Sequence, residues 1–358
     1  MMKHKTTITI FFILLLSLTG ITTAIRVSLP LSYSLDDILT GVATTEIEHA
    51  LTQQIPFKEI VTQAWARANF ALFNEGKSGV IVGQNGWLFS REEYFWPYSA
   101  ENNINANLQF VQHIQQQLSA IDMQLAVILL PEKVSIYAEY AAISSPLSQN
   151  NLYEQVAQTL TESSIQVISG KEALTKPLSQ QQTFLKTDTH WTPFGAQSVA
   201  NEAAKRLPSW HGDQVFTTEL SQTESVLGDL LNFIPAGDKW LKTRFTPDEI
   251  NINVTSLAAA EFDSLFDDAA PISTALVGTS YSADARWNFH GYLQQALELE
   301  IINYAKSGDG PFTPMHNLIN TNELQAQGIT HILWEIPVRY FIQELPTAIS
   351  VESDYEKL

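Results

Sequence analysis

Short apolar runs alternate with helical segments along most of this chain, and this alternation is the feature that most restricts its fold. Strands are predicted at 125–130, 165–168, 274–277, 301–304 and 331–336. Helices are predicted at 103–121, 151–162, 193–207, 286–299 and 323–328. Apolar strands that alternate with helices are typical of a parallel sheet covered by helices on both faces. We therefore predict an α/β fold of this kind.

The N-terminus combines a basic flank with a long apolar stretch. Residues 3–5 read Lys-His-Lys and precede an uncharged segment at 6–25 that is rich in Ile, Leu and Phe. A helix of about 20 residues spans about 30 Å, the thickness of a bilayer core. A basic flank is retained in the cytoplasm. We predict a signal anchor at 1–25, with the rest of the chain outside; cleavage after the small residues at 22–24 is the alternative.

Three further regions depart from the alternating pattern. Residues 34–75 have a mostly helical pattern that breaks at Pro56. Two apolar runs around Asn-Gly predict a hairpin within 79–89. A stretch rich in Asp, Thr and Leu interrupts the alternation near 213–266 and indicates an insertion. We expect a helical juxtamembrane region at 26–78 and a main domain at 79–350.

The composition excludes several kinds of chemistry. The chain has no cysteine, so disulfides, thiolate metal sites and a cysteine nucleophile are ruled out. With 20 basic and 38 acidic residues, the net charge is −18. An acidic body repels nucleic acid and anionic lipid, and it also repels an acidic polysaccharide unless a local basic groove compensates.

The run Lys-Thr-Asp-Thr-His-Trp at 186–191 carries the first candidate chemistry. Asp188 lies two residues before His190, and Thr192 with Pro193 predicts a helix N-cap and first residue. A carboxylate that orients an imidazole supplies two of the three groups of an acyl-transfer triad. A polar surface loop and a metal site are the alternatives, although no HExxH motif or second His cluster accompanies the pair.

The nucleophile must be serine or threonine, because cysteine is absent. The strand predicted at 274–277 leads into Gly278-Thr279-Ser280, where a helix is expected soon afterwards. A serine on a strand-to-helix turn presents its hydroxyl above the sheet, beside backbone N–H groups that can stabilise an oxyanion. Ser280 is therefore the candidate nucleophile, with an ordinary turn or helix cap as the alternative.

Several histidines compete for the role of general base. They are His4, His49, His113, His190, His211, His290, His316 and His331. We assign this role to His190, because Asp188 lies two residues before it and could fix its tautomer. His316, expected in a loop after a strand, is the strongest rival. His290 is expected about three turns beyond Ser280 on the same helical stretch, pointing away from it.

Taken together, several segments resemble the alginate O-acetyltransferase family of the AlgJ/AlgX type. The run at 186–193 is similar to the family signature, and the segments at 278–282 and 286–289 are similar to its nucleophile region. Other similar segments lie at 86–89, 310–315 and 334–337. The resemblance covers roughly residues 55–345, is specific as an ordered combination, and is nearer to the membrane-anchored AlgJ-like branch.

The resemblance implies an SGNH-hydrolase-like, flavodoxin-like fold with circularly permuted motif order, because the Asp/His pair precedes the serine. It implies a catalytic triad of Ser280, His190 and Asp188. The candidate oxyanion or substrate residues are Thr279, Tyr281, Arg286, Gly308 and Gly310. No cofactor and no metal ion are expected.

The resemblance further implies a periplasmic O-acetyltransferase held at the bacterial inner membrane by its N-terminal helix, or free in the periplasm if that helix is cleaved. The acceptor would be a hydroxyl of alginate or a similar exopolysaccharide. A multipass membrane acyltransferase would supply acetyl, and other exopolysaccharide biosynthesis proteins would be partners. A secreted carbohydrate acetylesterase and a non-catalytic scaffold of an export complex are the alternatives. Because an acidic body repels an acidic polymer, we expect this chain to relay acetyl within a complex in which a partner handles the polymer. Alternatively, the polymer is neutral.

Overall fold

The computed structural model describes residues 2–28, 32–144, 147–258, 273–347 and 349 of the 358-residue chain. The chain divides into two compact units, Met1–Asn74 with Pro235–Asp238 and Glu75–Ile234 with Lys239–Leu358. The sequence placed the change from helical region to main domain at 78–79. The predicted domain end at 350 and residues 259–266 of the predicted insertion lie outside the described residues.

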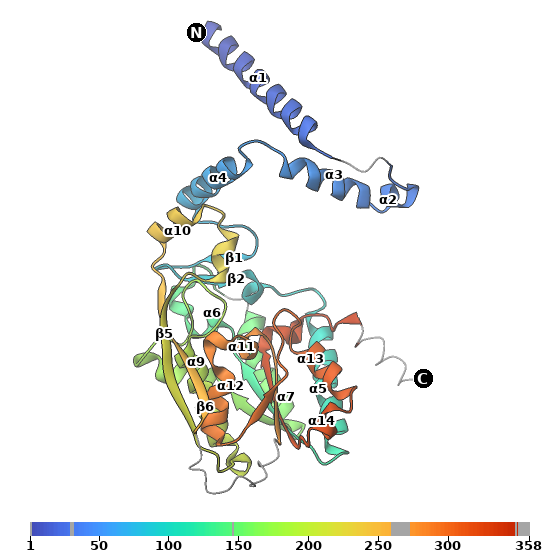
Figure 1. Cartoon of the computed structure of the whole chain (residues 1–358), viewed down its shortest axis with the longest axis vertical. Helices are drawn as coiled ribbons and strands as arrows, with labels where there is room; N and C mark the ends of the chain where they lie inside the picture. The colour runs from blue at the N-terminus through green and yellow to red at the C-terminus, as the bar shows by residue number, and fades with distance from the viewer. Residues whose placement is uncertain (1, 29–31, 145–146, 259–272, 348, 350–358) are drawn as a thin grey trace. The chain divides into compact units, whose positions relative to one another are not determined.

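The first unit is built from helices. In chain order they are α1 (Met2–Arg26), α2 (Leu35–Leu39), α3 (Val42–Gln53) and α4 (Lys58–Phe73). The helical pattern predicted at 34–75 is confirmed, and α3 and α4 lie on either side of the predicted break at Pro56. By length and composition α1, the first blue helix in Figure 1, can cross a bilayer: the window Thr9–Arg26 has a mean hydropathy of 1.8. A signal sequence passes the same test.

The second unit is built around a five-stranded sheet with strand order β4-β3-β9-β7-β8. Its strands are β3 (Gln124–Leu130), β4 (Gln166–Ser169), β7 (Thr274–Val277), β8 (Ile301–Asn303) and β9 (His331–Pro337). Every pairing in the sheet is parallel. When counting starts at β7, the order is that of a flavodoxin-like sheet, with the chain entering at the fourth strand. The predicted parallel sheet and permuted order are confirmed.

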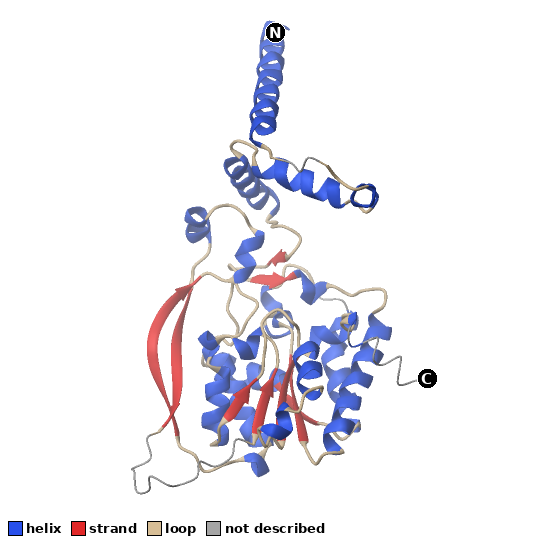
Figure 2. Ribbon diagram, turned by 45° about the vertical axis from the view of Figure 1, so that its right-hand side comes forward, coloured by secondary structure: helices blue, strands red, loops and turns tan. Residues whose placement is uncertain are grey.

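Helices cover both faces of this sheet, as Figure 2 shows. In β3, Ala126 and Ile128 join one hydrophobic core, whereas Val127 and Leu129 join the other. The first core includes residues of α8 (Gly170–Thr175), α9 (Pro193–Arg206) and α12 (Phe289–Leu297). The second includes residues of α5 (Ala100–Ser119), α7 (Leu147–Glu162), α13 (Phe312–Ile319) and α14 (Glu323–Ala326). Because consecutive side chains point to opposite faces and both faces are covered, β3 is apolar from Leu125 to Leu130.

Two antiparallel hairpins accompany the sheet. β1 (Val80–Val82) pairs with β2 (Leu88–Ser90), which confirms the predicted hairpin. β5 (Phe216–Val226) pairs with β6 (Asp248–Leu257) inside the predicted insertion, and α10 (Asp238–Arg244) lies between them in sequence. The second hairpin was not predicted, because most side chains of β5 are exposed or half-buried and leave no apolar alternation.

One predicted helix is divided in the structure. The stretch predicted at 286–299 consists of η6 (Ala285–Trp287) and α12, with α11 (Ser280–Ala283) before them. Asn288 has a φ of 50°, in the left-handed region, and this ends η6 before α12 begins. The remaining short elements are α6 (Lys133–Ile136), η1 (Arg91–Tyr94), η2 (Ala138–Tyr140), η3 (Lys176–Ser179), η4 (Pro208–Trp210), η5 (Asp229–Phe233) and η7 (Val338–Ile342).

Candidate active site

The candidate acid and base lie on a tight loop, residues 185–190, which we call the Asp–His loop. An antiparallel bridge between Phe184 and Trp191 closes its base, and the N–H of Thr192 donates to Thr183 O at 2.9 Å. Thr192 then caps α9, because its hydroxyl accepts from the N–H of Gly195 at 3.1 Å. The predicted N-cap is confirmed, and the loop is anchored to a regular element at its carboxyl end.

The structure brings the Asp–His loop to the candidate nucleophile. His190 Nδ1 lies 2.6 Å from Asp188 Oδ1, and His190 Nε2 lies 2.8 Å from Ser280 Oγ. Ser280 is the first residue of α11, after the turn that follows β7. As a carboxylate, Asp188 can only accept, so Nδ1 carries the imidazole proton. Nε2 is then left to accept the hydrogen bond from the Ser280 hydroxyl.

The surroundings of Asp188 favour its ionised form. Its side chain is buried, Oδ1 accepts from the N–H of His190 at 2.9 Å, and Oδ2 accepts from the N–H of Asp229 at 3.0 Å. Burial alone would raise the pKa of Asp188, but the hydrogen bonds and the imidazole charge outweigh burial and lower the pKa to about 2. A carboxylate that stays ionised can stabilise an imidazolium formed beside it.

Residues of the predicted insertion hold the Asp–His loop from outside. Asp229, the first residue of η5, accepts from the N–H of Thr189 at 2.9 Å and from its hydroxyl at 2.6 Å. The N–H of Gly228 donates to Thr187 Oγ1 at 2.9 Å. Sequence reasoning missed both residues, because single Asp and Gly residues in an irregular segment carry no motif. The insertion therefore contributes directly to the candidate site.

The turn at 278–282, which we call the nucleophile turn, rests on a buried carboxyl group. Glu335 of β9 is buried and accepts from the N–H of Thr279 at 2.8 Å and from its hydroxyl at 3.0 Å. It also accepts from the Ser282 hydroxyl at 3.0 Å. Burial raises the pKa of Glu335, and the hydrogen bonds oppose that rise. The predicted oxyanion candidate Thr279 therefore directs its N–H to Glu335, whereas Ser280 N–H has no intrahelical acceptor at the start of α11.

Sequence reasoning also left Glu335 without a role. The segment at 334–337 was singled out only for its resemblance to the family. Glu335 is the one acidic residue in the apolar run at 332–337. A glutamate inside a strand that is buried on both faces needs several donors, because an unpaired buried carboxyl group is costly. That signal could have indicated a buried partner at the end of a neighbouring strand.

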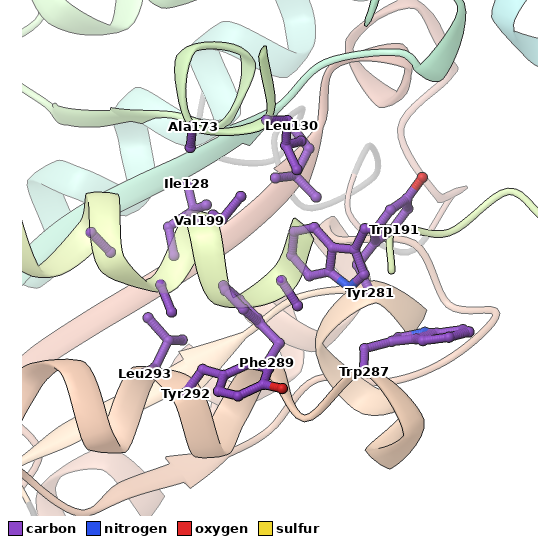
Figure 3. Packing of buried hydrophobic residues seen from close by; sticks show 14 of the residues in the cluster. Ile128, Leu130, Ala173, Trp191, Val199, Tyr281, Trp287, Phe289, Tyr292 and Leu293 are labelled. Carbon is purple, nitrogen blue, oxygen red and sulfur yellow. The ribbon is translucent and has the colours of Figure 1, made fainter. Parts of the chain in front are cut away.

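Tyr281 links the nucleophile turn to the Asp–His loop. Its hydroxyl donates to Thr189 O at 2.6 Å, and its ring centroid lies 5.0 Å from that of His190. Trp191 packs edge-on against Tyr281 at 5.1 Å, and Trp287 stacks on His190 at 5.5 Å. Figure 3 shows Trp191, Tyr281 and Trp287 within the core beside α9 and α12. The three aromatic side chains are buried, so they hold the site's shape from inside.

Arg286, predicted as a substrate candidate, lies on η6 with its side chain partly exposed. Its guanidinium donates to Asp284 Oδ2 at 2.6 Å and lies 4.8 Å from the centre of the Trp287 ring. Trp287 in turn stacks on His190. The cation is therefore paired and oriented near the candidate base, and its exposed edge can still meet a ligand.

Gly308 and Gly310, the other predicted candidates, lie in the loop after β8. Both have positive φ, 87° and 66°, which favours glycine at these positions. The N–H of Lys306 donates to Gly278 O at 3.1 Å and ties this loop to the nucleophile turn. A cavity of about 240 Å³ is lined by residues 308–312 and by Tyr340, Gln343, Glu344 and Pro346. The loop thus borders a small cavity, and its link to the turn is through Lys306.

The rival histidines lie elsewhere. His316 was expected in a loop but lies on α13, because that helix already begins at Phe312. Its Nε2 lies 3.1 Å from Asn320 Nδ2. His290 is on α12, a helix separate from that of Ser280, and its Nε2 donates to Ile301 O at 2.7 Å. Ser280 is therefore paired with His190, the histidine that the sequence favoured.

A cation could be considered at the same residues. One ligand atom from each of Asp188, His190 and Asp229 lies within 4.8 Å of the others. However, His190 Nδ1 and Asp188 Oδ1 are 2.6 Å apart, and two ligands each about 2.1 Å from a metal ion are normally farther apart than this. Asp229 also accepts two hydrogen bonds from Thr189. The arrangement suits a hydrogen-bonded pair better than a coordination sphere.

Comparison with known proteins identifies the family of this chain. A family model described as "SGNH hydrolase-like domain, acetyltransferase AlgX" matches residues 80–338. The probable alginate O-acetylase AlgJ of Pseudomonas putida is 35% identical over 85% of this chain and 80% of its own length. The probable alginate O-acetylase AlgJ of Azotobacter vinelandii is 34% identical over the same shares.

A solved structure is also similar to this chain. The O-acetyltransferase domain of Pseudomonas putida AlgJ matches with a TM-score of 0.69 and 32% identity, covering 76% of this chain and 95% of that domain. Sequence and fold therefore indicate the same family. The chain belongs to the AlgJ/AlgX family of alginate O-acetyltransferases, whose fold is SGNH-hydrolase-like.

Proposed function

We propose that this chain transfers acetyl groups to hydroxyls of alginate or an alginate-like exopolysaccharide through an acetyl-Ser280 intermediate. The observation that carries the proposal is the 2.8 Å contact between Ser280 Oγ and His190 Nε2, with Asp188 on the other ring nitrogen at 2.6 Å. The relatives of this chain in Pseudomonas putida and Azotobacter vinelandii are named probable alginate O-acetylases, which supports the substrate class. Ser280 is the nucleophile, His190 the general base and Asp188 the group that orients the ring.

In the first step, Ser280 Oγ attacks the carbonyl carbon of an acetyl donor while His190 Nε2 takes the hydroxyl proton. Negative charge then develops on the carbonyl oxygen. The N–H of Ser280 at the start of α11, with help from the loop at 307–310, stabilises this charge. The bond to the donor's leaving group breaks, and His190 returns the proton to that group. Acetyl-Ser280 remains.

In the second step, a sugar hydroxyl replaces the donor. His190 takes the proton of this hydroxyl, whose oxygen attacks the acetyl carbon. Ser280 Oγ leaves, recovers the proton from His190 and completes the cycle. Water in place of the sugar gives hydrolysis, so the same groups act as an esterase when the acceptor does not exclude water.

We place the reaction on the periplasmic side of a bacterial inner membrane, with α1 as an anchor. A multipass membrane acyltransferase is the proposed acetyl source, with other exopolysaccharide biosynthesis proteins as partners. The net charge of −18 opposes tight binding of a polyuronate, which favours acetyl relay within a complex. Tight binding of oligomannuronate by the isolated chain would contradict the relay.

The test uses the full chain in non-ionic detergent with para-nitrophenyl acetate as donor and oligomannuronate as acceptor. Peptide mass spectrometry locates acetyl on the protein, and a second analysis detects acetylated sugar. Ser280→Ala removes the proposed nucleophile. Ser163→Ala is the matched control, because Ser163 follows α7 and is not part of the candidate site.

The outcomes discriminate between a transferase, an acetylesterase and a non-catalytic scaffold. Acetyl on Ser280 together with acetylated sugar supports the transferase, and both should vanish in Ser280→Ala but not in Ser163→Ala. Free acetate without acetylated sugar would replace the transferase by an acetylesterase. Absence of any adduct, with no difference between Ser280→Ala and the unmodified chain, would overturn the triad and favour a scaffold.

A further inference from the structure

A buried lysine that the mechanism does not use lies under the Asp–His loop. Lys133 is the first residue of α6, and its side chain is almost entirely buried. Its ammonium group donates to Leu185 O at 2.8 Å, Lys186 O at 3.1 Å and Asp188 O at 2.8 Å. An ammonium group has three N–H donors, so one side chain meets three carbonyls of the loop that carries the candidate acid and base.

The other carbonyls of this loop are also bonded. Thr187 O accepts from the N–H of Leu230 at 3.2 Å, Thr189 O from the Tyr281 hydroxyl at 2.6 Å, and His190 O from the N–H of Leu185 at 3.1 Å. These three bonds come from η5, from the nucleophile turn and from the loop itself. Lys133 donates to the three remaining carbonyls of the loop, those of residues 185, 186 and 188. The carbonyl of residue 186 also accepts from the N–H of Leu88. Without it, buried carbonyls would lack a donor, which is costly.

The position of Lys133 is itself fixed by neighbours from the β1–β2 hairpin. The ammonium nitrogen lies 5.4 Å from the ring centres of both Trp87 and Phe89. Leu88, between them, donates its N–H to Lys186 O at 2.8 Å. The aromatic faces favour a cation at this place. This assigns a purpose to the segment at 86–89, which the sequence singled out without a role.

A buried carboxyl group fixes the helix start that carries Lys133. Glu93 accepts from the N–H of Ser90 at 2.8 Å and from the N–H of Val134 at 2.7 Å. It therefore joins the end of β2 to the first turn of α6. These contacts connect the β1–β2 hairpin, the start of α6 and the Asp–His loop. A substitution of Lys133 is therefore expected to alter the loop.

We propose that Lys133 is a positioning residue of the active site, which aligns Asp188 and His190 by fixing the backbone carbonyls of residues 185, 186 and 188. It does not touch the reacting atoms and acts through the loop. This inference rests on the proposed function, because it explains how the base is aligned with Ser280. A shift of the loop by about 1 Å would misalign His190 and lower kcat by about 100-fold.

Protonation of Lys133 provides a separate readout. Burial lowers the pKa of Lys133 to about 8, while the negative charges of Glu93, Asp188, Asp229 and Asp248 oppose the shift. Below this pKa three N–H groups meet the three carbonyls, and above it a neutral amine has only two. We therefore expect kcat to fall as pH rises through about 8.

The experiment compares Lys133→Met with Lys205→Met in the full chain in non-ionic detergent. Methionine keeps most of the lysine volume but has no donor, and Lys205 is an exposed lysine on α9. Acetylation of Ser280 by para-nitrophenyl acetate gives kcat and KM, and selective ¹⁵N-histidine NMR reports the Nδ1 proton of His190, assigned with His190→Gln. Thermal unfolding monitors the fold of each variant.

We expect Lys133→Met to lower kcat by about 100-fold with a much smaller change in KM, to abolish the alkaline fall near pH 8, and to weaken the Nδ1–H signal. Lys205→Met should change none of these. Unchanged kcat, pH profile and NMR signal in a folded Lys133→Met chain would overturn the inference.

Two further arms keep the inference testable if this variant unfolds or the proposed function fails. Because the chain has no cysteine, Lys133→Cys introduces a unique thiol. Bromoethylamine in denaturant restores an ammonium at this thiol, and recovery of kcat after refolding, with the unmodified chain treated in parallel, supports the inference. If the unmodified chain does not acetylate Ser280, the proposed function fails, and the His190 Nδ1–H signal alone then decides for or against Lys133.

Discussion

Asp188 on the Asp–His loop and Glu335 under the nucleophile turn are both buried carboxyl groups, yet their surroundings shift their pKa values in opposite directions. Asp188 faces an imidazole that can become positive, together with backbone N–H groups of His190 and Asp229. Glu335 meets neutral donors, the N–H and hydroxyl of Thr279 and the hydroxyl of Ser282. Burial is the largest influence on each, and the neighbours decide whether it is overcome.

One site therefore uses these two buried carboxyl groups for separate purposes. Asp188 is held ionised, as is needed to orient and stabilise a charged imidazole. Glu335 lies on β9, the neighbour of β7, and accepts several hydrogen bonds from the nucleophile turn. We therefore expect charge to matter at Asp188 and acceptor geometry to matter at Glu335.

The largest effect should come from removing the charge of Asp188 without changing its shape. Asp188→Asn should lower kcat by roughly 10⁴-fold, as it does in the serine-protease triad, because the amide favours the wrong imidazole tautomer. Glu335→Gln should lower kcat by less than about 10-fold, because its amide oxygen still accepts from Thr279. Initial rates of acetyl-ester turnover compare the two. Equal losses would remove the distinction.

Truncation of Glu335 should destabilise the fold strongly. Glu335→Ala leaves a cavity and removes the acceptor from Thr279 and Ser282, so we expect a loss of about 3 kcal/mol in the free energy of unfolding. Glu335→Gln should lose less than about 1 kcal/mol, since an acceptor remains. Denaturant unfolding measures both, with Glu154→Ala at an exposed ion pair as control. A small loss of unfolding free energy in Glu335→Ala would mean that the nucleophile turn keeps its conformation without the Glu335 carboxylate.

A close-packed glycine lies beside each carboxyl group. A Cβ at Gly228 would lie 2.4 Å from the backbone N of Asp188, whereas a Cβ at Gly278 would lie 2.5 Å from Glu335 Oε2. Backbone yields less than a side-chain end, so Gly228→Ala should destabilise by about 3 kcal/mol and Gly278→Ala by about 1 kcal/mol. Thermal unfolding of both variants tests the order, and the reverse order would show that Glu335 is the more rigid neighbour.

The last comparison is a pair of opposite pH dependences. The folded pKa of Asp188, about 2, lies below its ordinary value of 3.8, so its stabilisation is present above about pH 4 and is lost as pH falls towards 2. This stabilisation by Asp188 is on the order of 2 kcal/mol. The pKa of Glu335 is raised above 4.5, so its contribution is present at low pH and is lost as pH rises through the folded pKa.

Differences in unfolding free energy from Asp188→Asn and Glu335→Gln, measured across pH in non-ionic detergent, isolate these contributions. The advantage of the unmodified chain over Asp188→Asn should shrink towards low pH. Its advantage over Glu335→Gln should shrink towards high pH. Parallel curves would contradict the opposite pKa shifts and with them the comparison between the two regions.

Much of the fold could be predicted from local patterns. The strands of the sheet, the hairpin at 79–89 and the cap at Thr192 follow from apolar runs and turn residues, which act over a few positions. The β5–β6 hairpin could not be predicted in this way, because its exposed strands carry no alternation. The division of the helix at Asn288 also escaped, since a left-handed residue leaves little trace in composition.

The available chemistry can be read from the sequence alone: an Asp and a His two residues apart, a serine at a strand end, no cysteine and an apolar N-terminal helix. Which of these groups meet depends on the fold. The strand order brings Ser280 to His190 across 90 positions, and no local pattern encodes that pairing. The fold also places Lys133 and Glu335 beneath the reacting groups, and Asp229 on the outer side of the Asp–His loop. The burial that shifts the pKa values of Lys133 and Glu335, and the hydrogen bonds that these residues make, exist only in the folded chain.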